Sequence, residues 1–192
     1  MWRQIIIALR VVLLMTLLTG LVYPGVVTVL CHVLFPHKAN GSLVRVNGTI
    51  VGSSLIGQNF TKPQYFQPRP SAAGNGYDAS ISSGSNYGPT NQKLIDRVEA
   101  SIAEFRKENP EYKGPIPADL VTASASGLDP DISVASADAE AARVAQARGV
   151  PLEEITQVIR EHINGRALGF LGGPRVNVLE LNLALDRQFG HK

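Results

Sequence analysis

The segment from Val11 to Pro36 contains 26 residues without a single Asp, Glu, Lys or Arg, and it is the only such segment in the chain. The hydrocarbon core of a bilayer is ~30 Å thick, and an α-helix crosses it with about 20 residues at ~1.5 Å rise each. The segment is therefore long enough to span a membrane with some tilt. We predict one transmembrane helix over residues 11–36 and one domain outside the bilayer over residues 37–192.

The two ends of this helix differ in charge. Arg3 and Arg10 precede it, whereas Lys38 alone follows closely. Because positive charge is retained on the cytoplasmic side of a membrane, residues 1–10 are predicted to be cytoplasmic and residues 37–192 extracytoplasmic. A cleaved signal peptide is the alternative, but its apolar region is usually about 7–15 residues long and ends in a small-x-small site. We therefore expect the helix to be retained as an anchor.

Small or polar residues recur at every fourth position of the predicted helix: Thr16, Gly20, Pro24, Thr28 and His32. This spacing keeps them on one connected ridge that drifts by ~40° per step. Small and hydroxyl residues let a second membrane helix approach closely, and Pro24 predicts a kink. We expect the ridge to pack against helices of a partner. The alternative is that these residues are ordinary constituents of a membrane helix.

The net charge of +2 comes from the two arginines before the span, because the other sixteen basic residues balance the sixteen acidic ones. A nucleic-acid interface is therefore not predicted. Cys31 is the only cysteine and lies in the span, so the sequence predicts neither a disulfide framework nor a cysteine metal site.

The domain after the span begins with a β-hairpin signal. Asn47-Gly48 separates two apolar runs and predicts strands over 43–46 and 49–56. Prolines then keep the chain extended. Residues 71–91, SAAGNGYDASISSGSNYGPTN, have the composition of a flexible linker. Three large side chains within them (Tyr77, Ile81 and Tyr87) favour an ordered functional loop instead, and both interpretations stay open.

Helical periodicity marks two segments in the middle of the domain. A helix beginning at 90–91 and ending at Asn109 carries one apolar face, formed by Leu94, Ile95, Val98, Ile102 and Phe105. An alanine-rich helix is predicted over 137–148, with Ser136 as its N-cap and Gly149 as its stop.

Two further helices are predicted towards the C-terminus. One begins at Pro151 and ends at Asn164-Gly165, with an inward face of Leu152, Ile155, Val158, Ile159 and Ile163. Residues 178–186 fit both a strand and a helix, and the pairing of Asn177 with Glu180 resembles a capping box, which favours the helix. The predicted fold class is an α+β extracytoplasmic domain anchored by one N-terminal transmembrane helix.

Known catalytic patterns are missing from the sequence. It contains no P-loop, no H-E-x-x-H and no carboxylate–histidine cluster that would predict a metal. The segment VTASASGLDP at 121–130 is a candidate polar motif with Thr122, Ser124, Ser126 and Asp129. Its hydroxyls suit helix capping and turn formation. A membrane-tethered hydrolase that uses Ser124 or Ser126, or a ligand-binding module, remains the alternative function.

Several long segments carry a family resemblance, namely GSLV at 41–44, GSSLIGQ at 52–58, YFQPRPSAAGNGYDASISSGSNYGPTN at 65–91, IPADLVTASASGLDP at 116–130, ARVAQARG at 142–149 and GFLGGPRVNVLELNLALD at 169–186. Together with Tyr23-Pro24-Gly25 in the span, they resemble the C chain of the bacterial high-affinity potassium-transporting P-type ATPase, the Kdp system. The resemblance covers nearly the whole chain. It departs from the family at Gly173, where an acidic residue is expected, and at Asp131, where His is common.

The resemblance implies a non-catalytic subunit of a complex in the bacterial inner membrane. Its partners would be a potassium-filter subunit, an ATP-hydrolysing subunit and a small single-helix subunit, together with the bilayer. The filter subunit would handle potassium. The residues of this chain predict no directly bound cofactor, and ATP is implied only by the family resemblance. The family is also credited with promoting ATP binding by the ATPase subunit, as a catalytic chaperone. An extracytoplasmic domain would face away from ATP, so assembly, or shaping the approach of potassium, fits the predicted topology better.

Within this resemblance, two groups of residues are candidates for function. The first forms the candidate docking loop: Arg69, Ser71, Asn75, Tyr77, Asp78, Asn86 and Tyr87. The second is a C-terminal motif containing Arg175 and Asn177.

Overall fold

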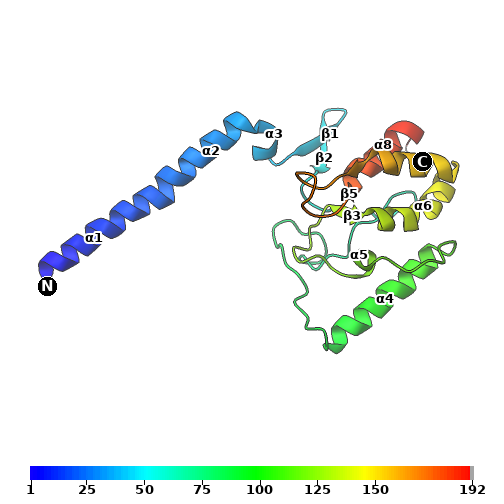
Figure 1. Cartoon of the computed structure of the whole chain (residues 1–192), viewed down its shortest axis with the longest axis horizontal. Helices are drawn as coiled ribbons and strands as arrows, with labels where there is room; N and C mark the ends of the chain where they lie inside the picture. The colour runs from blue at the N-terminus through cyan, green and yellow to red at the C-terminus, as the bar shows by residue number, and fades with distance from the viewer. Residues whose placement is uncertain (191–192) are drawn as a thin grey trace. The chain divides into compact units, whose positions relative to one another are not determined.

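The computed structural model describes residues 1–190 of the chain, which form two compact units. The first extends from Met1 to Val51, and the second begins at Gly52 and contains the remaining elements. Figure 1 traces the elements in chain order. The chain has an α+β fold with a long apolar N-terminal helix, as the sequence predicts, and it contains two small sheets.

The first unit consists mainly of a helical rod built from α1 (Trp2–Leu17), a π-helical segment η1 (Leu18–Val22) and α2 (Tyr23–Leu34). Together these 33 residues are long and apolar enough to cross a membrane. A short helix α3 (Pro36–Ala39) follows. By length and composition, this helix is a candidate membrane span and suggests a membrane-anchored protein.

The π-helical segment lies directly before Pro24, where the sequence predicts a kink. Pro24 lacks an N–H, so the carbonyl of Gly20 loses its ordinary helical donor. The helix widens at this point, and the N–H of Tyr23 donates to the carbonyl of Leu18, five residues earlier. The helix thus accommodates the proline by a local widening.

Strands β1 (Leu43–Val46) and β2 (Thr49–Ser53) form a two-stranded sheet, as predicted. The turn between them has positive φ at both Asn47 (50°) and Gly48 (80°), the geometry of a type I′ hairpin turn. Strand β2 ends at Ser53, three residues before the predicted end.

A three-stranded antiparallel sheet lies in the second unit, with the order β3-β5-β4. Its strands are β3 (Asp131–Ser133), β5 (Arg175–Asn177) and β4 (Ile163–Asn164), and Val176 of the central strand faces both Ile132 and Ile163 in register. The sequence did not predict this sheet, because two- and three-residue strands are too short to display a periodicity.

Helices α6 (Val134–Arg148), α7 (Leu152–Glu161) and α8 (Val178–Phe189) pack together beside this sheet. Helix α7 contacts both α6 and α8, and Figure 1 shows α6 in yellow and α8 in orange to red. Apolar side chains of the three helices form the main core together with one residue each from β3, β5 and the loop after β2. This core comprises Phe66, Ile132, Ala137, Ala141, Val144, Ala145, Ile155, Val158, Ile159, Val176, Val178, Leu181 and Leu185. The helical interpretation of residues 178–186 is confirmed, because the side chain of Asn177 caps α8 by accepting from the N–H of Glu180.

Two helix boundaries differ from prediction. Helix α6 starts three residues early, because Ser133 is the N-cap and accepts from the N–H of Ser136 at 3.1 Å. The hydroxyl of Ser136 is buried instead and donates to Asp119 at 2.7 Å. Helix α7 ends at Glu161, since the next residues enter β4. Its inward face is Ile155, Val158 and Ile159, whereas the predicted inward residues Leu152 and Ile163 are exposed.

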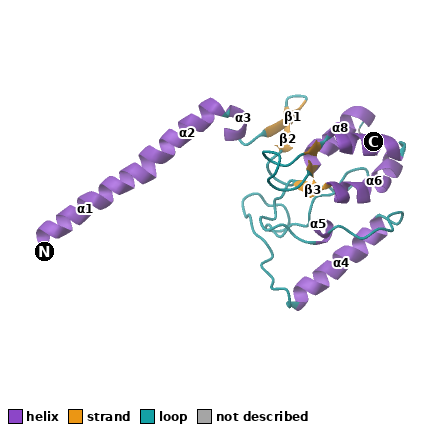
Figure 2. Ribbon diagram, viewed as in Figure 1, coloured by secondary structure: helices purple, strands orange, loops and turns teal. Residues whose placement is uncertain are grey.

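Helix α4 (Gln92–Glu108) has the predicted bounds, with Asn91 as N-cap, but only one end of its apolar face is buried. Phe105 is buried, while Ile95 and Ile102 are 40% and 39% exposed. A short helix α5 (Ala118–Val121) follows, and α4 contacts it. Figure 2 shows that most of the chain between β2 and α6, apart from these helices, is loop.

Candidate docking site

The candidate docking loop, residues 69–91, folds onto the segment 124–129. Ser71 organises the turn at its start: the Ser71 hydroxyl donates to the carbonyl of Gly127 at 2.6 Å and accepts from the N–H of Tyr77 at 2.8 Å. The Tyr77 hydroxyl then donates to the carbonyl of Arg69 at 2.7 Å, and burial raises the pKa of Tyr77 to about 12. Residues 71–84 thus form an ordered loop in this structure.

The backbone of the docking loop lies in close contact with the backbone of residues 125–127. A Cβ atom added at Gly127, which has a φ of +67°, would lie 2.6 Å from the carbonyl oxygen of Ser83. A Cβ added at Gly84 would lie 2.7 Å from the carbonyl oxygen of Ala125. Ser82 adds a hydrogen bond to the carbonyl of Ser126 at 3.0 Å. Both glycines are needed because another side chain would separate the two segments.

Two ion pairs, one from the docking loop and one within the three-stranded sheet, meet on the short segment 129–131. Arg69 pairs with Asp129 at 2.9 Å, and Arg175 pairs with Asp131 at 2.8 Å. Burial raises the pKa of Asp131 above its ordinary value, although Arg175 acts in the opposite direction. Asn177 donates to the carbonyl of Ser54 at 2.9 Å while its oxygen caps α8. The loop motif and the C-terminal motif are therefore structurally linked.

The remaining residues of the predicted loop differ in their surroundings. Asn75, Asn86 and Tyr87 are exposed. Tyr87 lies under the guanidinium of Arg97, 5.7 Å from the ring centre. Two hydrogen bonds from Ser80 lower the pKa of Asp78.

The polar motif serves local structure. The Thr122 hydroxyl, just after α5, donates to the carbonyl of Ala118, the first residue of that helix. The Ser126 hydroxyl accepts from the N–H of Leu128 at 3.1 Å. Ser124 is buried. Within residues 1–190, no histidine is hydrogen-bonded to either serine, and no group of His, Cys, Asp and Glu side chains could hold a metal ion. The hydroxyls of Thr122, Ser124 and Ser126 therefore do not form a shared accessible surface.

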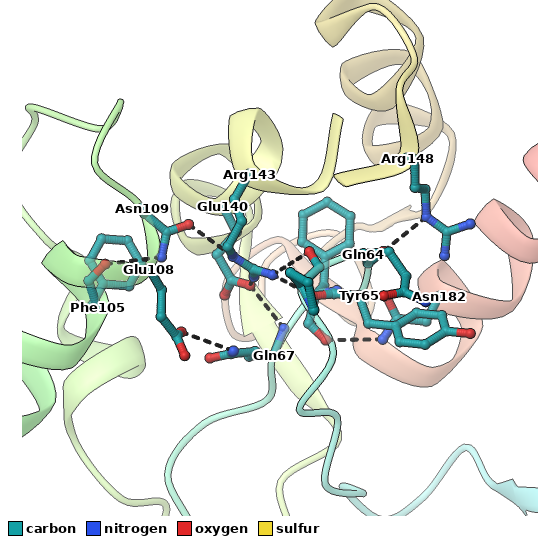
Figure 3. Close-up of polar contacts among 12 residues, drawn as sticks. Gln64, Tyr65, Gln67, Phe105, Glu108, Asn109, Glu140, Arg143, Arg148 and Asn182 are labelled. Atoms are coloured by element: carbon teal, nitrogen blue, oxygen red, sulfur yellow. Dashed lines mark hydrogen bonds and ion pairs between the residues drawn. The ribbon is translucent and has the colours of Figure 1, made fainter. Parts of the chain in front are cut away.

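A buried polar cluster, which the sequence analysis did not predict, holds the extended segment 63–67 that leads into the loop (Figure 3). Arg143 donates to the carbonyls of Pro63 and Tyr65 at 2.6 and 3.0 Å. Asn182 accepts from the N–H of Phe66 at 2.8 Å and donates to its carbonyl at 3.0 Å. Side chains of α6 and α8 thus satisfy backbone groups that a neighbouring strand would otherwise bond.

Glu140 completes this cluster. It is fully buried, accepts from the backbone N–H of Gln67 at 2.9 Å and pairs with Arg143. Burial raises the pKa of Glu140 to about 7, while Arg143 opposes the shift. Arg148 pairs with Asp186 at 2.8 Å and donates to the carbonyl of Gln64 at 2.9 Å.

One signal in the sequence could have revealed the cluster. Glu140, Arg143 and Arg148 lie on a helix otherwise rich in alanine, and such a helix allows close approach of neighbouring segments. Charged residues placed between buried alanines must then find partners inside. Only the caps of this helix were predicted from the sequence, not the burial of its charges.

The ridge residues of the predicted span, from Thr16 to His32, are exposed along the apolar helix. The ring of His32 is hydrogen-bonded to the carbonyl of Thr28 at 2.9 Å. Their packing against partner helices stays a prediction.

Comparison with known proteins identifies the family. A family model described as the c chain of the K+-transporting ATPase matches residues 5–187. A protein of Myxococcus xanthus, named potassium-transporting ATPase KdpC subunit, is 56% identical over 99% of this chain and 90% of its own length. A protein with the same name from Rhodospirillum rubrum is 57% identical over 91% of this chain and 91% of its own length. Another from Mycobacterium bovis is 50% identical over 97% of this chain and 100% of its own length. These matches confirm the resemblance drawn from the sequence segments, and the chain belongs to the KdpC family.

Proposed function

We propose that this chain is a non-catalytic accessory subunit of an ATP-driven potassium pump and that it acts in assembly. Its family membership and its relatives' name, potassium-transporting ATPase KdpC subunit, support this function. The observation that supports docking is the loop 69–91, which is bonded to residues 124–129 through its first half and whose entry is held by buried side chains of α6 and α8. The apolar N-terminal helix would provide the second attachment.

The proposed partners are the potassium-filter subunit, the ATP-hydrolysing subunit and the small single-helix subunit. The ridge from Thr16 to His32 would pack against their membrane helices, and the docking loop would contact the filter subunit. Potassium would be bound by that subunit. Promotion of ATP binding would then be an indirect effect of assembly, because the proposed orientation places residues 37–192 outside the cytoplasm.

Docking is tested with exposed side chains, since Ser71 and Tyr77 also hold the loop together. We expect Asn75→Ala with Tyr87→Ala to reduce the amount of this chain recovered with an affinity-tagged filter subunit. Asn164→Ala, also exposed but in β4, is the matched control and should leave recovery unchanged. Full recovery and full potassium-stimulated ATPase activity of the loop variant would contradict docking through this loop.

Topology requires its own experiment. In a Cys31→Ser background, Ser85→Cys gives a single reporter in the docking loop, because Cys31 is the only cysteine of the chain. An impermeant thiol reagent should label it from outside intact cells. Labelling only after the cytoplasmic face is opened would reverse the orientation and bring this domain to the same side as ATP.

The alternative of a tethered hydrolase is not favoured. Ser124 is only 4% exposed, and the Ser126 hydroxyl is bonded to the backbone of its own turn. A serine nucleophile needs a general base within hydrogen-bond reach. Changing both serines to Ala should therefore leave the ATPase activity of the complex largely unchanged.

A further inference from the structure

The loop between β4 and β5, residues 165–174, exposes three large apolar side chains within four positions. Leu168, Phe170 and Leu171 are 83%, 68% and 50% exposed. Single exposed apolar residues are normal on a protein surface, but a contiguous group marks an interaction site. We call residues 165–174 the apolar loop.

The apolar loop has a defined backbone structure. Ala167 and Leu171 exchange two backbone hydrogen bonds of 2.9 Å each, and the N–H of Gly169 donates to the carbonyl of Arg166 at 3.1 Å. Strands β4 and β5, which pair with each other, hold its two ends. The three apolar side chains are therefore presented by a closed turn, which reduces the entropy that a partner must overcome on binding.

Leu168 also adopts a conformation that large side chains avoid. Its φ is +53°, in the left-handed region that glycine and asparagine tolerate far better than leucine. Since the side chain is 83% exposed, packing within the chain does little to offset this strain. Strained backbone at an exposed position is typical of a functional site. A leucine here is better explained by contact with another molecule than by the fold of this chain.

Charge distinguishes between possible partners. From Asn164 to Asn177 the only charged residues are Arg166 and Arg175, and Arg175 is paired with Asp131. A loop that inserts into lipid is typically flanked by Trp or Tyr and by several free cations, whereas this loop has neither Trp nor Tyr. A rigid group of Leu and Phe with one exposed Arg instead resembles the anchor of a protein–protein interface.

The apolar loop is also continuous with the docking loop. Arg175 at its base pairs with Asp131, and two residues earlier Asp129 pairs with Arg69 at the start of the docking loop. The two loops thus adjoin through one short segment, residues 129–131.

We propose that the apolar loop inserts into an apolar depression, rimmed by carboxylates, on another subunit of the same pump. Phe170 and Leu171 fill the depression, and Arg166 meets its acidic rim. This inference rests on the proposed function and adds a second contact surface, beside the docking loop, between this domain and the pump.

The test uses the full chain expressed with the other subunits. Phe170→Ser and Leu168→Asn should each lower recovery of this chain with a tagged partner subunit at least several-fold. Leu152→Ser, an exposed leucine on α7, is the matched control and should not. Because Asn tolerates positive φ, Leu168→Asn should keep or raise the unfolding temperature of the isolated chain, so a loss of recovery would not reflect misfolding.

The outcomes separate this inference from the proposed function. If the Asn75/Tyr87 variant loses recovery while both apolar-loop variants retain it, the inference about the apolar loop is wrong and docking stands. If all of them retain full recovery, docking of the domain fails as well.

A fluorescence experiment tests for lipid as the occupant. In a Trp2→Phe background, Phe170→Trp gives a single tryptophan in the apolar loop, because the chain has one Trp. In nanodiscs we expect a blue shift of its emission only when the other subunits are present, without quenching by brominated lipid. Quenching by brominated lipid in the chain alone would assign the loop to the bilayer and overturn the proposal.

Discussion

Glu140 is the most unusual residue of the domain, since it is a carboxyl group with no exposure to solvent. Burial raises its pKa to about 7, from 4.5 for the free side chain. When folding raises the pKa of a carboxyl group, its contribution to the free energy of unfolding is fully present below the pKa of the unfolded chain. That contribution is lost as the pH rises through the pKa of the folded chain. The Glu140 carboxyl is therefore expected to contribute most to the free energy of unfolding at acidic pH and least above pH 7.

This pKa gives a testable pH dependence. The unfolding free energy of the unmodified chain, relative to that of Glu140→Gln, should decrease as the pH rises from 4.5 to 8, because glutamine cannot ionise. Urea unfolding of the detergent-solubilised chain at several pH values measures the difference. Glu153→Gln, on the exposed first turn of α7, is the control and should show no such trend. A difference that does not change with pH would contradict the assignment.

Two glycines of the docking loop provide a matched pair. Neither Gly84 nor Gly88 has positive φ, but a Cβ at Gly84 would lie 2.7 Å from the backbone of Ala125, whereas Gly88 has open space. Gly84→Ala should therefore cost about 1–3 kcal/mol of stability. Gly88→Ala should be neutral, or stabilising by up to ~1 kcal/mol through the unfolded state. Thermal unfolding of both variants tests whether the loop is pressed against residues 124–127.

At the scale of elements, the extended segment 63–67 behaves as a strand whose partners are side chains. Asn182 alone satisfies both backbone groups of Phe66. Asn182→Ala would leave a buried N–H and a buried carbonyl without partners, at a cost of about 2–4 kcal/mol.

Hydrogen exchange can locate that effect. In Asn182→Ala the amides of residues 66–84 should exchange faster than in the unmodified chain, because the entry to the docking loop is released. Asn164→Ala removes an exposed asparagine and should leave exchange in this segment unchanged. Protection lost evenly over the whole domain would mean that Asn182 supports the fold in general rather than the loop.

The elements also show which features the sequence could predict. Helix α4, the caps at Asn91 and Asn177 and the hairpin at Asn47-Gly48 follow from local patterns, which a single segment displays. The sheet β3-β5-β4 depends on pairing between residues up to 46 positions apart in strands of two or three residues. Such pairing leaves no local periodicity to detect.

In the candidate docking site, too, local features could be predicted from the sequence and long-range contacts could not. The sequence marked the docking loop and the motif at 121–130 as dense in polar residues, yet it did not show that Ser71 bonds the carbonyl of Gly127. Nor did it show that Arg143 and Glu140 are buried, because the same charges on a helix would also suit a solvated face. Whether a polar residue faces water depends on the tertiary packing of distant segments.

At the scale of the whole molecule, the π-helical segment changes the geometry of the ridge in the span. Four residues of α-helix turn by ~400°, so positions four apart drift by ~40° per step. A π turn contains more residues and rotates less per residue. Since it lies between Thr16 and Pro24, it reduces the drift and brings the ridge from Thr16 to His32 closer to a straight line.

Pro24→Leu tests this geometry. It restores the missing N–H, so the segment should return to α-helix, and residues 2–17 should rotate relative to the second half of the helix. We expect recovery of the chain with the other subunits to fall several-fold, while the free chain becomes no less stable. Val27→Leu lies outside the ridge and is the control. Unchanged recovery of Pro24→Leu would show that the ridge does not carry helix packing.

The buried cluster also imposes an order on events during synthesis. The side chains that bond the backbone of the extended segment follow it at separations of 73 to 116 positions, and the last of them, Asn182, lies in α8. At ~5–20 residues per second, the ribosome completes the span and the docking-loop sequence seconds before α8 emerges. Until then the loop lacks the side chains that hold it, although the anchor can already be in the membrane. A chain truncated before α8 lacks Asn182 and so lacks the side chain that bonds both backbone groups of Phe66 at the entry to the docking loop. Under the proposed function, such a chain should not be recovered with the other subunits.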